Sequence, residues 1–177
     1  MLQNGHASLL TALESHCWPT KAASDLACRA HIVPYEKHSV IFHSGEAADL
    51  VYVLLSGEVK LEYRASDGSE LLVSIADAGQ MLGLFVPEQA GSASNAKPEQ
   101  LFTARALSRC KVAIIPTERV AHGLQQLPAE RVVRVLENNH EHWVRLSCRL
   151  LEYLSMGIRC RLTHALSEIA DHFSVSD

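Results

Sequence analysis

The sequence of 177 residues lacks the cysteine spacings that mark metal knuckles and redox dithiols. Its cysteines are odd in number, widely scattered and without a C-x-x-C pair: Cys17, Cys28, Cys110, Cys148 and Cys160. Neither a zinc knuckle nor a dithiol site is therefore indicated. We predict reduced thiols that pack as small hydrophobic side chains, and we predict no metal site.

The sequence also lacks long apolar runs and any strong excess of charge. No segment approaches the apolar length needed to span a bilayer, and the N-terminus lacks the charged and apolar blocks of a signal peptide. The formal net charge is −4 and the pI is about 6.2, so the surface as a whole should not attract nucleic acid. These absences predict a cytoplasmic protein with no membrane partner.

Motifs that would carry catalysis are missing as well. No G-x-S-x-G nucleophile motif occurs. On the predicted strands, the H-x-H spacing with a following Glu and a later His, which a metal-dependent enzyme on a β-roll would need, is also missing. We therefore predict that the protein is not an enzyme and has no catalytic residues.

Short apolar runs that end at glycine, serine or aspartate fill the first two thirds of the chain. Such runs precede Gly45 and Gly57, and Asp67-Gly68 follows them as a hairpin signal. Strand-forming runs at this regular spacing are typical of an all-β sandwich, barrel or roll. We predict strands at His31–Tyr35, Val40–His43, Leu50–Leu55, Glu58–Arg64, Glu70–Ile75, Leu101–Leu107 and Lys111–Ile115.

Helices are predicted on both sides of these strands. Two short ones, Ser8–His16 and Lys21–Ala30, are separated by Pro19, and another opens at Pro116. From Pro128 onward apolar residues recur at steps of three and four, which predicts one long helix whose stripe pairs with a second copy. The expected dimer interface is Val133, Leu136, His140, Trp143, Ser147, Leu150 and Leu154.

The residues from Phe42 to Leu61 follow the order F-x-x-G-E-x-A-D-x-x-Y-x-L-x-S-G-x-V-x-L. This order resembles the cyclic-nucleotide-binding domain of Crp/Fnr-type bacterial transcription regulators. The matching residues are Phe42, Gly45, Glu46, Ala48, Asp49, Tyr52, Leu54, Ser56, Gly57, Val59 and Leu61.

The resemblance implies an α+β fold and a division of the chain. The fold would be an antiparallel β-roll (a double-stranded β-helix, jelly-roll-like) with short N-terminal helices and a long C-terminal dimerisation helix. The sensor domain would occupy residues 1–127 and the dimerisation helix residues 128–156. Residues 157–177 would form a hinge at Gly157 and a first helix leading to a winged helix-turn-helix that is absent from this chain.

The function implied by the resemblance is that of an effector-sensing and dimerisation module of a DNA-binding transcription regulator. The expected partners are a second copy, a small-molecule effector, and DNA only through the domain absent here. An alternative is a standalone ligand-binding roll that acts through protein–protein contacts.

The sequence departs from its relatives where a cyclic nucleotide would bind. An arginine must neutralise the phosphate and a carboxylate must hold the ribose. Relatives that bind cAMP carry the carboxylate in a G-E-L motif and, further along the chain, the arginine in an R-[ST]-A motif. Here Leu84 follows Gly83, and Gln100 and Leu101 stand where the arginine and its neighbour are expected. We predict an effector other than cAMP or cGMP. The candidate pocket residues are Leu72, Ser74, Gly83, Leu84, Phe85, Leu101, Thr103, Arg105, Leu146 and Ser147.

Haem is the alternative cofactor, because some relatives in this family sense gases with it. The sequence has 10 histidines, and axial ligation would need one of them, such as His140 or His142, inside an apolar pocket. A polar His140 in a dimer seam would instead specify register. The iron–sulfur branch of the family needs clustered N-terminal cysteines, and only Cys17 and Cys28 lie there, so no cluster is expected.

Overall fold

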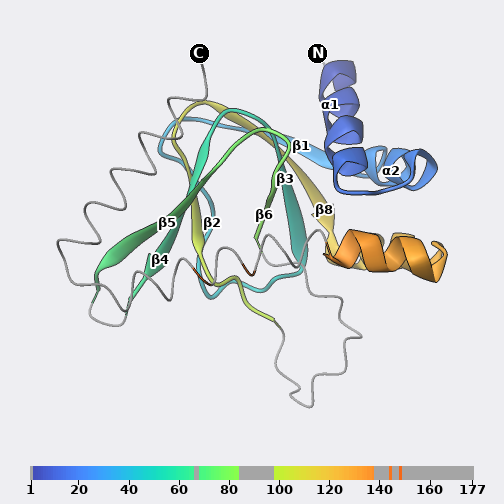
Figure 1. The fold of residues 1–177 in the computed structure, drawn as a ribbon. Helices are drawn as coiled ribbons and strands as arrows, with labels where there is room; N and C mark the ends of the chain where they lie inside the picture. Colours follow the sequence, from blue (N-terminus) through green and yellow to red (C-terminus); the bar gives the residue numbers. More distant parts are fainter. Residues whose placement is uncertain (1, 66–67, 84–97, 138–143, 145–147, 149–177) are drawn as a thin grey trace.

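The computed structural model describes residues 2–65, 68–83 and 98–137, and the single positions 144 and 148. Helices α1 (Leu2–Ser15) and α2 (Thr20–Ala27) precede the strands, and α3 (Thr117–Gln125) follows them (Figure 1). The strands are β1 (His31–Tyr35), β2 (Val40–Phe42), β3 (Leu50–Ser56), β4 (Val59–Arg64), β5 (Glu70–Ala76), β6 (Met81–Leu82), β7 (Thr103–Ala106) and β8 (Cys110–Pro116).

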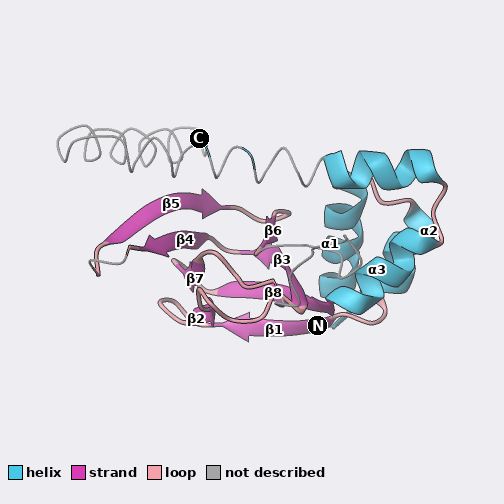
Figure 2. Cartoon of the chain, turned by 90° about the horizontal axis from the view of Figure 1, so that it is seen from below, coloured by secondary structure: helices cyan, strands magenta, loops and turns pink. Residues whose placement is uncertain are grey.

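In the described part of the chain these strands form two four-stranded sheets. Their orders are β1-β8-β3-β6 and β2-β7-β4-β5, and every strand pair is antiparallel. The predicted α+β fold with an antiparallel β-roll is confirmed. The helices gather at one end of the roll, with β1 to β8 extending away from them (Figure 2).

Strands β3 and β8 of the first sheet are buried on both faces, which explains their nearly continuous apolar runs. Along β3, Val51 and Val53 pack against the helices, whereas Tyr52 and Leu54 face the second sheet, as the two-residue period of a strand requires. We call the two clusters the helix-side core and the roll interior. The helix-side core includes Leu9, Leu13, Trp18, Leu26, Val51, Val53, Ala113, Ile115, Val120, Leu124 and Val135. The roll interior includes Phe42, Tyr52, Leu54, Val59, Leu61, Val73, Leu82, Phe102, Ala104, Ala106 and Val112.

The second sheet buries only one face. In β7 the side chains of Ala104 and Ala106 are fully buried, and Thr103 and Arg105 alternate with them. The polar residues therefore lie on the face turned away from the roll interior.

Several element boundaries differ from the sequence-based prediction. Helix α1 begins at Leu2 rather than Ser8, and it includes Gly5, where an added Cβ would lie 2.6 Å from Ile32 Cδ1. The glycine that weakens the helix signal thus permits the helix to pass close to β1. Strand β6 is only two residues long, paired with Tyr52 and Val53 of β3, and was too short to predict from periodicity.

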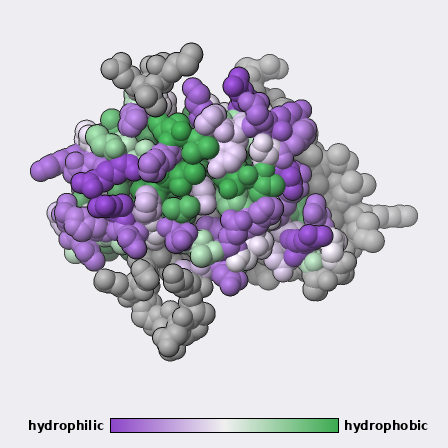
Figure 3. Space-filling model, turned by 180° about the vertical axis from the view of Figure 1, so that it is seen from behind, coloured by the Kyte–Doolittle hydropathy of each residue, from purple (hydrophilic) through white to green (hydrophobic). Residues whose placement is uncertain are grey.

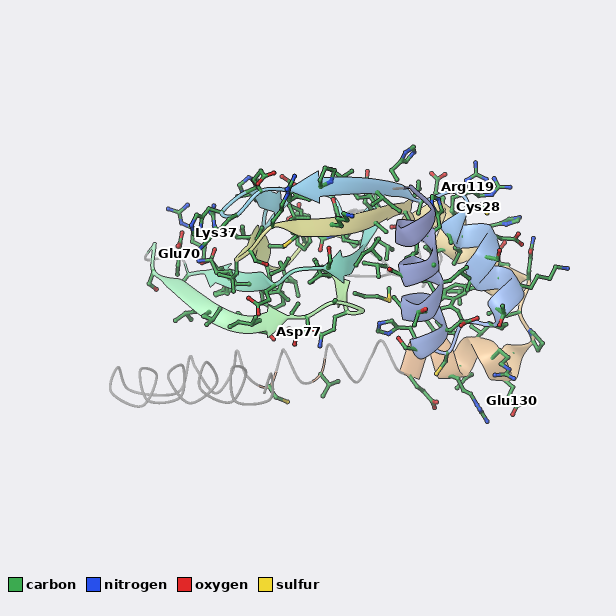
Figure 4. The ribbon with its side chains drawn as sticks, turned by 90° about the horizontal axis from the view of Figure 1, so that it is seen from above. Cys28, Lys37, Glu70, Asp77, Arg119 and Glu130 are labelled. Carbon is green, nitrogen blue, oxygen red and sulfur yellow. The ribbon has the colours of Figure 1, made fainter. Side chains whose placement is uncertain are left out.

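The hairpin between β4 and β5 agrees with the Asp-Gly signal. Gly68 has φ +84°, in the left-handed region that favours glycine. Its N–H donates to Ala65 O at 2.9 Å, and Ala65 N–H donates to Ser69 O at 2.9 Å. Figure 4 shows Lys37 and Glu70 at the end of the roll away from the helices, and Cys28 and Arg119 at the helical end.

Candidate functional site

The two ends of the segment where relatives bind phosphate come together in the structure. Gln100 is held by its backbone, because its N–H donates to Glu46 O at 2.7 Å and its carbonyl accepts from Gly45 N–H at 2.8 Å. Gly83 follows β6 with φ +81°. These contacts attach the chain after the segment to the loop that carries the G-E pair of the family motif.

The side chain of Gln100 lies against Gly83 and is only 2% exposed. A Cβ added to Gly83 would lie 2.8 Å from Gln100 Oε1 and 3.0 Å from its Nε2. Any larger residue at position 83 would therefore displace the amide. At the position where relatives place a phosphate-binding arginine, this chain buries a neutral amide. Gln100 stands at the position of the missing arginine but was not among the predicted pocket residues.

The two residues after Gln100 differ in burial. Leu101, a predicted pocket residue, is 49% exposed, whereas Phe102 is 2% exposed and belongs to the roll interior. The predicted strand therefore starts later than expected, at Thr103 instead of Leu101. Phe102 replaces the alanine of the family R-[ST]-A pattern, so an aromatic ring occupies interior volume that a small residue leaves free.

The predicted pocket residues Thr103 and Arg105 lie on the outer face of the second sheet. Arg105 Nε is 3.4 Å from Glu62 Oε2, and its guanidinium also donates to His38 O at 3.2 Å. Glu62 is shared with Lys60, with which it forms a second ion pair. These contacts direct the Arg105 side chain away from the roll interior.

Two other predicted pocket residues, Leu72 and Ser74, lie on β5. Leu72 and Thr103 both stand opposite Glu62 of β4, so they occupy one row across the sheet. Ser74 stands opposite Leu61 and donates to Ile75 O at 3.3 Å. Outside the described residues lie the pocket candidates Leu84, Phe85, Leu146 and Ser147, the interface candidates His140, Trp143, Leu150 and Leu154, and the hinge Gly157.

Residues 129–137 are helical, and this helix divides its apolar residues between two faces. Val135 is 4% exposed in the helix-side core, and Val132 and Leu136 pack against that core. Val133 is 51% exposed and Val144, eleven positions later, is 42% exposed. Eleven residues are close to three turns of an α-helix, so positions 133 and 144 fall on one face in the helical period of the sequence.

A cavity of about 1060 Å³ lies beside this helix. Its walls come from the loop before β3, from α3, and from the helix at 129–137. The described lining residues are Ala47, Ala48, Asp49, Leu50, Pro98, Pro116, Thr117, Glu118, Ala121, His122, Leu124, Gln125, Leu127, Ala129, Val132, Val133 and Leu136. The predicted interface residues Val133 and Leu136 thus line a cavity within the same chain.

Seen from behind, apolar side chains gather in the middle of the molecule and hydrophilic residues surround them (Figure 3). An apolar area of this kind is typical of surfaces that contact a partner or a ligand.

The described histidines do not suit a haem inside the roll. Among the described positions no histidine is buried: His6 and His16 are partly buried, and the exposed ones are His31, His38, His43 and His122. No group of three or more His, Cys, Asp or Glu side chains in this part of the chain could hold a metal ion. Axial ligation from the described residues would therefore have no donor in the roll interior.

The described cysteines are free thiols, and one of them packs in the core. Cys110 is fully buried, its Sγ lies 3.3 Å from Glu58 O, and burial raises the pKa of its thiol. Cys17, Cys28 and Cys148 are exposed, so the packing predicted for all of them holds at Cys110 alone among the described residues.

Burial also shifts the pKa values of two other side chains, Tyr52 and His16. It raises the pKa of Tyr52 to about 12, with further upward contributions from the charges of Glu46 and Asp49. Burial lowers the pKa of His16, although its Nε2 lies 3.0 Å from Gly79 O and that contact acts in the opposite direction. The Tyr52 shift thus arises mainly from burial, and the carboxylates of the loop before β3 add to it in the same direction.

With this geometry, the chain can be compared with known proteins. The model of the cyclic nucleotide-binding domain family matches residues 32–126, and the chain belongs to that family. The resemblance to the cyclic-nucleotide-binding domain of Crp/Fnr-type regulators is thereby confirmed. The cAMP-activated global transcriptional regulator CRP of Salmonella typhimurium is 30% identical over 101 residues, which cover 55% of this chain and 44% of that protein. The chain thus matches less than half the length of that relative.

Solved structures share the fold of this chain. A putative cAMP-binding regulatory protein from Silicibacter pomeroyi is 22% identical, with a TM-score of 0.62 over 85% of this chain and 65% of that one. The c-di-GMP responsive regulator CLP of Xanthomonas campestris is 20% identical, with a TM-score of 0.61 over 85% of this chain and 72% of that one. In the part of the chain that the structure describes, no helix is long and apolar enough to cross a membrane.

Proposed function

We propose that this chain is the effector-sensing and dimerisation module of a Crp/Fnr-like transcription regulator that does not respond to cAMP. The observation that carries the proposal is the sequence Gln100-Leu101-Phe102, which replaces the arginine-containing pattern of nucleotide-binding relatives. DNA contact would belong to a part of the regulator outside this chain.

The physical argument concerns the phosphate and the ribose. A cyclic phosphate in this site would meet the neutral amide of Gln100 instead of a guanidinium, and a buried anion without a cationic partner is strongly disfavoured. The carboxylate that would hold the ribose is also missing, because Leu84 follows Gly83. Each lost polar interaction costs about 1–3 kcal/mol, so these two losses would weaken a micromolar ligand toward the millimolar range.

Calorimetric titration with cAMP and cGMP tests this part of the proposal. We expect no heat of binding with either nucleotide up to about 1 mM, the range that two such losses predict. The variant Arg105→Ala serves as a control, because Arg105 pairs with Glu62 on the outer face and should not change the result. Micromolar binding by the wild-type protein would refute the proposal, and its loss in Arg105→Ala would assign the phosphate to that arginine.

The second part of the proposal is a homodimer formed through the helix that begins at residue 129. Val133 and Val144 are exposed apolar residues, and covering them with a second copy of the helix would remove apolar surface from water. We expect Val133→Glu and Val144→Glu to shift sedimentation from dimer to monomer. Arg131→Glu is the matched control, since it adds the same side chain at an exposed position on another face. A wild-type monomer at high concentration would contradict the dimer.

A further inference from the structure

The walls of the cavity beside α3 are fixed by hydrogen bonds between its elements. Thr117 N–H donates to Asp49 O at 2.9 Å, and Thr117 Oγ1 donates to Ala48 O at 3.3 Å. Ala48 N–H in turn donates to Pro98 O at 2.8 Å. The loop before β3 and the start of α3 therefore form one rigid wall, and a ligand would find this wall already in place.

The size and lining of the cavity suit an organic ligand with a substantial apolar part. The volume of about 1060 Å³ is at the upper end of small-molecule sites, which span roughly 300–1,000 Å³. Most of the described lining side chains are aliphatic, among them Leu124, Leu127, Val132 and Leu136. Burial of an aliphatic or aromatic ligand against them would supply the main driving force.

The charged groups of the lining have one sign. Asp49 and Glu118 contribute carboxylates, and no lysine or arginine occurs among the described lining residues. The lining also contains His122. The N-terminus of α3 offsets about half an elementary charge, so the two carboxylates leave this wall negative. An anion such as a phosphate would be repelled here, and an ammonium group would be attracted.

We propose that this cavity binds a small amphipathic molecule that carries a cationic group, with the cation at Asp49 and Glu118. The inference rests on the proposed sensor function, because it identifies the class of effector. Such a ligand would contact the roll, α3 and the helix residues Val132 and Val133 at once. Occupancy would then favour the helix orientation that completes the cavity, which is a shift between two states of different affinity.

Calorimetry with decylammonium and decanoate below their micelle concentrations, and with decanol below its solubility limit, tests the class of ligand at about pH 8, where imidazole is neutral. The series keeps the apolar chain and changes only the head-group charge. We expect decylammonium to bind roughly tenfold more tightly than decanoate, with decanol between them. Equal or tighter binding of decanoate, or no binding of any member, would overturn the proposal.

Three variants test whether the ligands bind in this cavity. Asp49→Asn combined with Glu118→Gln should abolish the preference for the cation, and Ala121→Trp should weaken all three ligands by filling the cavity. Glu130→Gln is the control: Glu130 is outside the lining and points outward (Figure 4), with its side chain 85% exposed. A preference that survives the double variant, or affinities that Ala121→Trp leaves unchanged, would refute the site. Circular dichroism spectra must match wild type for each variant compared.

Sedimentation with and without decylammonium separates this inference from the proposed function. If the cavity binds the cation but the protein is monomeric in both conditions, the ligand class stands and the dimeric sensor fails. If the protein is dimeric and the decyl series does not bind, the sensor stands and the cavity assignment fails.

Discussion

Phe102 and Leu101 are adjacent, both apolar, and differ in exposure from 2% to 49%. We expect Phe102→Ala to destabilise the protein strongly and Leu101→Ala hardly at all. Phe102 lies in the roll interior beside residues such as Phe42, Tyr52 and Leu82, whose side chains are held by the surrounding strands. The two alanine variants therefore form a matched pair that separates interior packing from surface exposure.

The magnitude follows from the burial of the ring. Replacing a buried phenylalanine by alanine costs about 3–5 kcal/mol, as lost transfer free energy plus the cavity that remains. For a protein of this size a loss of 1 kcal/mol lowers Tm by about 2–4 °C, so Phe102→Ala should lower Tm by about 6–20 °C. Leu101→Ala should change the free energy of unfolding by about 0.5 kcal/mol or less, as exposed substitutions do.

Urea denaturation followed by circular dichroism measures both variants, with protein concentration held constant because dimerisation would add to apparent stability. The slopes with urea must agree with wild type before the free energies are compared. Equal losses for the two variants, or a loss below about 1 kcal/mol for Phe102→Ala, would refute the placement of Phe102 in the roll interior.

Three further predictions concern backbone and ionisation. Gly57→Ala should cost about 3 kcal/mol or more, because φ is +87° and the new Cβ would lie 2.6 Å from Arg109 O, whereas Gly45→Ala, with φ +85° and open space, should cost about 1–2 kcal/mol in urea denaturation. Since the folded pKa of Tyr52 is raised to about 12, stability should fall as pH rises from about 10 through 12. Tyr52→Phe should flatten that fall, and a difference in phenolate absorbance between wild type and Tyr52→Phe that titrates near 10 would contradict it. The lowered pKa of His16 predicts stability that is present above about 6.5 and lost as pH falls through the folded value; an NMR titration midpoint at or above 6.5 would be inconsistent with its burial.

Much of the roll was predictable because each strand and turn is indicated by residues that are close together in the sequence. The prediction for His31–Tyr35 coincides with β1, and the Asp67-Gly68 signal lies at the turn between β4 and β5. Alternation of apolar and polar residues and the turn preference of glycine act within a few positions, so a single sequence carries them.

The arrangement of the site could not be predicted in the same way. Leu101 and Phe102 are both apolar, so periodicity does not determine which one faces inward when the strand begins after them. The burial of Gln100 depends on Gly83, which lies far from it in the sequence. The cavity is more remote still, because its walls come from three separate segments, around Asp49, along α3 and along the helix at 129–137. Contacts of this kind follow from tertiary packing.

The first sheet belongs to two cores, and this has a mechanical consequence. Strand β3 presents Val53 to the helices and Leu54 to the roll interior, both fully buried. Close-packed interiors have low compressibility and transmit strain. Because β3 contributes side chains to both cores, strain in one core reaches the other through this strand. Val135 belongs to the same cluster as Val51 and Val53, and the backbone between these two residues carries Tyr52, whose ring packs on Phe42 at 4.7 Å between centroids. We therefore expect a movement of the helix to be felt in the packing of the roll interior.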